Sequence, residues 1–144
     1  MGASGAGKTS LLNILADRVT SATPTQLSGN ITFNDEIPVN KLTFQQYAAY
    51  VMQDDILFAT FTVREALTFS ARLKLKTDIA VQDKLIDSII DDLSLAHVRN
   101  TQIGTLARKL ITTGERKRCA IGVELVSDPS AVLLDEPTSG LDSF

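Results

Sequence analysis

The chain has 144 residues, of which 44% are hydrophobic and 22% charged, and its formal net charge is −3. This size and composition are typical of one globular domain or of part of one. The acidic balance argues against a nucleic-acid surface that acts through bulk positive charge. No apolar run approaches the roughly 20 residues that a membrane-spanning helix needs. The single cysteine, Cys119, excludes an internal disulfide framework, fits a reducing cytosolic compartment and is expected to be a buried apolar residue of a helix.

The chain begins with a glycine-rich segment that matches the pattern G-x-x-x-x-G-K-[ST] at every fixed position. Small residues let backbone N–H groups surround phosphates, Lys8 places a cation on the β and γ oxygens, and the Thr9 hydroxyl can hold Mg²⁺. A turn that only caps a helix has no need of Lys followed by Thr at this spacing. The segment therefore predicts binding of a nucleoside triphosphate with magnesium. The expected binding residues are Gly2, Ala3, Ser4, Gly5, Ala6, Gly7, Lys8, Thr9 and Ser10.

Helices and strands alternate after this loop. Apolar residues at helical spacing predict helices, and short apolar or alternating runs predict strands. Thr62 and Glu65 have the spacing of a capping box, which predicts the start of the second helix. The order of the elements predicts an α/β fold. The expected helices cover residues 8–18, 63–73, 78–93 and 113 or 114 to 126, and the expected strands cover 29–35, 48–52 and 131–134.

The last expected strand leads into two carboxylates. Its continuous apolar run is typical of a strand that is buried on both faces of a mostly parallel sheet. Asp135 follows it at the carboxyl end, where open α/β sheets bind ligands, and a carboxylate there can hold Mg²⁺. Glu136 is the candidate for polarising an attacking water. The alternative, an acidic pair that only caps a turn, is disfavoured by the upstream phosphate loop.

A phosphate loop normally links the end of a buried strand to a helix, and here only Met1 precedes it. The chain also ends eight residues after Glu136, at Phe144. We therefore expect the sequence to be an internal part of a longer protein.

Five segments in this order make the chain resemble the nucleotide-binding domain of ATP-binding-cassette (ABC) transporters, and among these the white/ABCG subfamily of half-transporters. The segments cover residues 2–10, 50–55, 62–67, 114–118 and 134–143. The resemblance implies a P-loop NTPase fold with a mostly parallel core sheet, a small antiparallel β part and a helical subdomain at about 62–126. It also implies that residues 1–144 are an incomplete ATP-binding domain that uses ATP and Mg²⁺.

The resemblance assigns catalytic and metal-binding roles to four residues. Gln53 matches the glutamine of the Q-loop, which touches Mg²⁺ and the catalytic water, and its amide offers both an acceptor and donors. Gln53 and Glu136 are therefore the expected catalytic residues. Thr9, Gln53 and Asp135 are the expected contacts of the metal.

The resemblance also implies partners. The segment Thr112, Thr113, Gly114 and Glu115 matches the signature loop, which binds the γ-phosphate of ATP held by the opposite subunit, and Asp142 lies in the D-loop at the same interface. A second nucleotide-binding domain, in a homo- or heterodimer, and a transmembrane domain of the same parent chain are expected, without nucleic acid. The implied function is ATP hydrolysis that powers export, at the cytoplasmic face of a membrane.

The signature loop departs from the pattern of the family, which usually has Ser-Gly-Gly where this chain has Thr112, Thr113 and Gly114. Thr112 keeps a hydroxyl donor. Thr113 replaces a glycine with a β-branched residue, which blocks close backbone approach and disfavours a positive φ. We therefore expect this half-site to be weakened, or specialised for an asymmetric dimer.

Other functions remain open at this point. One is a soluble ABC ATPase of the translation-factor type, and another is a regulatory subunit that binds ATP and hydrolyses it weakly. A GTPase is disfavoured, because Asn40-Lys41-Leu42-Thr43 has Thr43 where a guanine-reading motif has a carboxylate. His97 is expected to be a surface residue at a helix end. The run Arg116-Lys117-Arg118 is expected on a solvated helix face or at an interface with the membrane domain.

Overall fold

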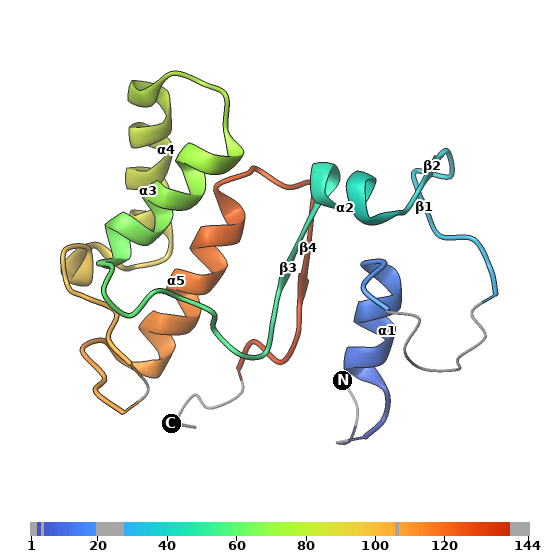
Figure 1. Cartoon of the computed structure of the whole chain (residues 1–144), viewed down its shortest axis with the longest axis horizontal. Helices are drawn as coiled ribbons and strands as arrows, with labels where there is room; N and C mark the ends of the chain where they lie inside the picture. Colours follow the sequence, from blue (N-terminus) through green and yellow to red (C-terminus); the bar gives the residue numbers. More distant parts are fainter. Residues whose placement is uncertain (1–2, 4, 20–27, 106, 139–144) are drawn as a thin grey trace.

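The computed structural model describes residues 3, 5–19, 28–105 and 107–138. Three long helices form one part of the molecule, and short strands flanked by helices form the other (Figure 1). Within the described ranges, no helix has both the length and the apolar character that crossing a membrane requires. The elements are α1 (Lys8–Leu15), β1 (Thr32–Phe33), β2 (Ile37–Pro38), α2 (Lys41–Tyr47), β3 (Ala48–Val51), α3 (Val63–Lys74), α4 (Ile79–Asp92), the 3-10 helix η1 (Ala96–Val98), α5 (Thr113–Leu125) and β4 (Ala131–Leu134).

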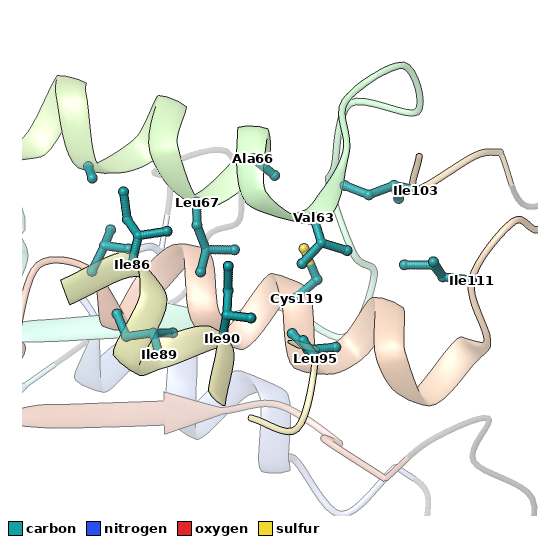
Figure 2. Packing of buried hydrophobic residues seen from close by; sticks show 12 residues of the cluster. Val63, Ala66, Leu67, Ile86, Ile89, Ile90, Leu95, Ile103, Ile111 and Cys119 are labelled. Atoms are coloured by element: carbon teal, nitrogen blue, oxygen red, sulfur yellow. The ribbon is translucent and has the colours of Figure 1, made fainter. Parts of the chain in front are cut away.

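The larger hydrophobic core lies between α3, α4 and α5. Leu67 of α3, Ile86 and Ile90 of α4 and Cys119 of α5 are fully shielded from solvent, and their side chains converge between the helices (Figure 2). Burying one Leu or Ile side chain contributes roughly 1.5–3 kcal/mol. The predicted burial of Cys119 is confirmed, and this burial raises the pKa of its thiol to about 12, so that it stays neutral.

Capping boxes determine where α3 and α5 begin. The Thr62 hydroxyl accepts from the Glu65 amide at 3.2 Å, and the Glu65 carboxylate accepts from the Thr62 amide at 2.8 Å, as predicted. Thr112 and Glu115 make the same two bonds at the start of α5, at 3.2 and 2.7 Å. Loss of such a cap typically costs about 1 kcal/mol. The cap therefore holds residues 112–115 in one backbone conformation.

The predicted strands at 48–52 and 131–134 are present as β3 and β4. They pair in parallel, with Val51 opposite Leu134. All four residues of β3 are buried, since α2 and α5 both pack against it. The prediction that β4 is buried on both faces is wrong, because Ala131 and Leu134 are exposed and β3 is the only strand that pairs with it in the described residues. The architecture is mixed α/β, and the wider core sheet stays a prediction.

The segment between α1 and β3 holds two elements that the sequence analysis missed. The predicted strand at 29–35 is only Thr32–Phe33, because Asn34 and Asp35 turn the chain with positive φ of 50° and 62°, and β2 returns antiparallel to β1. The side chain of Asn40 then caps α2, and the Thr43 hydroxyl accepts from the Asn40 amide at 2.8 Å. The run 40–43 is therefore a helix start, which agrees with rejecting a guanine-reading role.

Gly104 lies in the chain that leads to α5 and cannot be replaced without strain. Its φ is +74°, and an added Cβ would lie 2.4 Å from the carbonyl oxygen of Arg108. We expect Gly104→Ala to lower the free energy of unfolding by about 1–3 kcal/mol or more, measured by denaturant titration of the protein that contains this chain. The control is Gly29→Ala, where φ is also positive, at +121°, but no atom in the described part of the chain lies within 4 Å of the added Cβ, chain neighbours aside. Equal losses in the two variants would contradict the steric explanation.

Candidate nucleotide site

The parallel pairing of β3 and β4 brings the ends of both strands to one edge. The amide of Asp135 extends the ladder by donating to the carbonyl of Val51 at 3.0 Å. Asp135 therefore directly follows β4 at the edge where Gln53 follows β3, with one residue between Gln53 and that strand. The start of α1 also reaches this edge, because the Thr9 hydroxyl donates to Oδ1 of Asp135 at 3.0 Å. Residues distant in sequence thus meet as the phosphate-loop and carboxylate motifs predicted.

Two glycines of the loop before α1 have left-handed backbone conformations. Gly5 and Gly7 have φ of +80° and +84°, a conformation that residues with a Cβ rarely adopt. Apart from their chain neighbours, no atom of the described residues lies within 4 Å of where their Cβ would be, so these residues leave the space beside both glycines open. Gly7 caps α1 without a side-chain bond, and the N–H groups of the first helical turn have no partner within the helix. The side chain of Lys8 folds back along the loop and donates to the carbonyl of Ala3 at 3.1 Å.

The Thr9 and Asp135 oxygens fit one side of a magnesium site. Both are hard oxygen ligands, which Mg²⁺ prefers, and Asp135 is only 4% exposed. The Tyr50 hydroxyl approaches Oδ2 of Asp135 at 3.5 Å, and burial and then the nearby carboxylate raise the pKa of Tyr50. In the part of the chain that the structure describes, no three His, Cys, Asp or Glu side chains gather as a metal cage. Mg²⁺ is usually bound by one or two carboxylates together with phosphate oxygens and water, so a site of this kind does not require such a cage.

Glu136 lies between Gln53 and Lys8. Its Oε2 accepts from Nε2 of Gln53 at 3.3 Å, and its Oε1 lies 3.6 Å from Nζ of Lys8. The backbone of Glu136 has a φ of +47°, a left-handed conformation that costs a non-glycine residue of the order of 1–3 kcal/mol. The structure thus holds the candidate base in a strained turn, in contact with both the Q-loop amide and the phosphate-loop cation.

The predicted signature residues lie elsewhere in the molecule. Thr112 to Glu115 form the start of α5, on the opposite side of β3 and β4 from α1 (Figure 1). Thr113 is the first residue of the helix and has no positive φ, so this position does not require the conformational freedom of glycine. Its hydroxyl accepts from Nζ of Lys109 at 3.2 Å. The predicted weakening of this half-site by the added side chain stays a prediction.

The start of α5 has a further contact that the sequence did not reveal. His97, in η1, is an exposed residue of a short helix as predicted, and its Nε2 lies 2.7 Å from Oε1 of Glu115. Burial raises the pKa of Glu115, but the Thr112 amide, His97 and the Thr112 hydroxyl together outweigh burial and hold this pKa below its ordinary value. One carboxylate therefore caps α5 and also connects the helix to η1.

The prediction that the basic run at 116–118 lies on a solvated helix face is wrong, and the alternative, an interface with the membrane domain, stays a prediction. Lys117 is 4% exposed, and Arg116 and Arg118 are half-buried. Successive helix residues point about 100° apart, so three in a row cannot all face solvent on a helix that packs against both α3 and β3. That geometric limit is the signal in the sequence that could have identified a buried cation.

Three predicted site residues lie outside the described residues. They are Gly2, Ser4 and Asp142.

These features define a mixed α/β protein with a phosphate-loop motif beside a pair of carboxylates, and comparison with known proteins agrees. A family model described as "ABC transporter" matches residues 1–139. The chain belongs to the ABC transporter family.

Similar curated proteins confirm the resemblance to the G subfamily. The chain is 41% identical to ABC transporter G family member 19 of Arabidopsis thaliana and 45% identical to ABC transporter G family member 3 of Dictyostelium discoideum. It is 44% identical to the broad substrate specificity ATP-binding cassette transporter ABCG2 of Mus musculus. Each alignment covers 99% of this chain but only 20%, 10% and 21% of the respective relative. The chain thus spans about a fifth of the length of the Arabidopsis and mouse relatives and about a tenth of the length of the Dictyostelium relative.

The lowered pKa of Glu115 predicts a pH-dependent contribution to stability. A carboxyl whose pKa is lower in the folded state than its ordinary value of 4.5 stabilises the fold above that value, and this stabilisation is lost as the pH falls through the folded-state pKa. We therefore expect Glu115→Gln to lower the free energy of unfolding at pH 7, and the difference from the wild type to shrink below pH 4.5. Denaturant titrations across this range measure it, with exposed Glu36→Gln as the control. A difference that does not vary with pH would refute the assignment.

Proposed function

We propose that this chain binds ATP with Mg²⁺ and hydrolyses it as part of the nucleotide-binding domain of an ABCG-type transporter, powering export of a substrate across a membrane. The observation that carries the proposal is the contact between Thr9 of the phosphate loop and Asp135 after β4, at 3.0 Å. These residues are 126 positions apart, and no requirement of helix or strand formation brings a hydroxyl and a carboxylate together there. Binding of one metal ion by both side chains would explain why the Thr9 hydroxyl and the Asp135 carboxylate lie together.

The residues around this contact divide the work of phosphoryl transfer. The open loop at Gly5 and Gly7 would receive the phosphates, and Lys8 would neutralise part of their charge. Thr9 and Asp135 would hold Mg²⁺, which when bound neutralises the charge that develops on the β and γ oxygens.

The pair of Gln53 and Glu136 would handle the attacking water. The Glu136 carboxylate would accept a proton from the water. The side-chain amide of Gln53, whose Nε2 lies 3.3 Å from Oε2 of Glu136, would orient both the water and the carboxylate. The existing bond between the two side chains supports this division, because it already places an acceptor and an orienting amide side by side.

The position of the signature loop supports a second nucleotide-binding domain as partner. Residues 112–115 lie across β3 and β4 from this chain's own phosphate loop, so an ATP that they touch would belong to another copy or a related domain (Figure 1). The relatives are named as transporters, which favours the transporter over a soluble ATPase of the translation type. A transmembrane domain in the complete protein and a place at the cytoplasmic face of a membrane are part of this proposal.

A second candidate function is a regulatory subunit that binds ATP and hydrolyses it weakly. The observation that favours it is Thr113, whose side chain occupies the first position of α5 and bonds Lys109 where the family usually has a glycine. Single-turnover hydrolysis measured separately at the two sites of a dimer distinguishes the candidates. A regulatory role predicts slow turnover at the site that this signature loop completes.

Replacing Lys8 tests the nucleotide site. Lys8→Ala should abolish ATP binding by the complete protein, because the charge of the phosphates remains while the cation beside them is lost. Equilibrium binding of a fluorescent ATP analogue measures it. Lys84→Ala, at an exposed position of α4, is the control and should bind normally. Tight binding by Lys8→Ala would disprove the assignment of the phosphate loop.

Replacing Glu136 separates hydrolysis from binding. Glu136→Gln keeps the shape and the contact with Gln53 but loses the basic carboxylate, so ATP should still bind while steady-state hydrolysis falls by about 10²–10⁴-fold. Phosphate release and ATP affinity are measured on the same preparation. Hydrolysis at the wild-type rate would show that another group activates the water.

A further inference from the structure

Lys117 is a buried cation that the proposed chemistry does not use. It lies in α5, and its side chain is 5% exposed. Its Nζ donates to the carbonyl oxygen of Gln53 at 2.7 Å and approaches the carbonyl oxygen of Met52 at 3.4 Å. Its third partner is Oδ1 of Asp55, at 2.7 Å, in a side chain that is 9% exposed. The ammonium of Lys117 therefore contacts three residues, Met52, Gln53 and Asp55, of the segment that follows β3.

The Asp55 contact is an ion pair without hydrogen-bond alignment. Among the described residues, no donor is in line with the buried Oδ1 of Asp55, so Lys117 provides the charge that balances this carboxylate. A buried carboxylate without a compensating cation is strongly unfavourable. The ammonium thus has two separate roles: it compensates the charge of Asp55, and it donates a hydrogen bond to the backbone carbonyl of Gln53.

The backbone that Lys117 holds belongs to the residue that touches Glu136. The side-chain amide of Gln53 donates to Oε2 of Glu136 at 3.3 Å, while the backbone carbonyl of Gln53 accepts from Lys117. Gln53 is itself exposed, so packing does little to fix it. The hydrogen bond from Lys117 is therefore a principal constraint on where this amide lies.

The same lysine is rigidly connected to the signature loop. Lys117 is the fifth residue of α5, whose first residue is Thr113 and whose cap is Thr112. A helix of this kind moves as a unit, so a displacement of its first turn carries Lys117 with it. The contacts of α5 thus connect residues 112–115, on one side of β3 and β4, with Gln53 at their carboxyl edge.

We propose that Lys117 is a positioning residue that couples the signature loop to the Q-loop, by holding the Gln53 carbonyl and thereby the amide that contacts Glu136. This inference rests on the proposed ATPase function for its kinetic consequence, but not for its structural one. Closing of a partner on the signature loop would then be transmitted through α5 to the catalytic pair of the same chain.

The test separates the hydrogen bond from the ion pair. Lys117→Met alone would leave the buried Asp55 carboxylate without its cation, which is strongly destabilising and would obscure the effect of the lost hydrogen bond. The informative pair is Asp55→Asn and Asp55→Asn combined with Lys117→Met. In Asp55→Asn the ammonium loses its carboxylate but keeps neutral oxygen acceptors at Gln53 and Met52, so the bond to Gln53 remains. The double variant removes this bond and leaves no buried charge. Lys84→Met, at an exposed position of α4, is the control for removing a lysine.

Two measurements are made on the full-length protein. The first is hydrogen–deuterium exchange of amides in residues 52–57 without nucleotide, and the second is steady-state ATP hydrolysis. Relative to Asp55→Asn, the double variant should exchange faster in this segment. Its kcat should be about tenfold lower, as expected for the loss of one charge-assisted hydrogen bond that positions a catalytic group. Its affinity for ATP should stay within about twofold, because the phosphate loop is untouched.

The outcomes separate the proposals. Equal exchange in residues 52–57 of the two variants would overturn the positioning role, and so would equal kcat values. A loss of ATP affinity as large as the loss of kcat would also overturn it, since Lys117 would then act on the fold as a whole. Absence of hydrolysis by the wild-type protein would refute the proposed function, while the exchange measurement would still decide the inference.

Discussion

The parallel pairing of β3 with β4 is the constraint on which the site depends. Val51 lies opposite Leu134, so the residues that follow the two strands lie at the same edge. Gln53 therefore lies close to Asp135 and Glu136, although more than 80 positions separate it from them. Side-chain contacts alone would not hold this arrangement, because Gln53 is exposed and Glu136 half-buried. The strand ladder, extended by the amide of Asp135, fixes the backbone, and the side-chain bonds refine it.

The sequence predicted those parts of the molecule that depend on local signals. Capping residues and apolar spacing located α3, α4 and α5 to within one or two residues, since a Thr with Glu three positions later satisfies the first N–H groups of a helix in any context. The phosphate loop and the two carboxylates were predicted to act together, and the contact of Thr9 with Asp135 agrees with that expectation. The roles of these residues in hydrolysis stay predictions.

Features that depend on tertiary packing were missed or mistaken. The apolar run of β4 suggested burial on both faces, but burial depends on neighbouring strands, and β3 is the only one that pairs with it in the described residues. Lys117 looked like a surface charge because lysine is rarely buried without a partner, and its partners lie more than 60 residues earlier in the chain. The bond between His97 and Glu115 likewise joins two elements whose proximity no local pattern encodes.

The first two turns of α5 concentrate these tertiary contacts, which changes the meaning of the substitution at Thr113. Within five residues, the helix bonds Lys109 through Thr113, η1 through Glu115 and the Q-loop through Lys117. A glycine at the first position would leave Lys109 without this hydroxyl partner and would add backbone freedom to the helix start. We expect the Thr113 side chain to reduce the space for a partner's phosphate, while its bond to Lys109 restrains the first turn. These two effects on hydrolysis oppose each other. The rate at the site that this loop completes therefore depends on whether the proposed coupling through Lys117 needs a rigid first turn of α5.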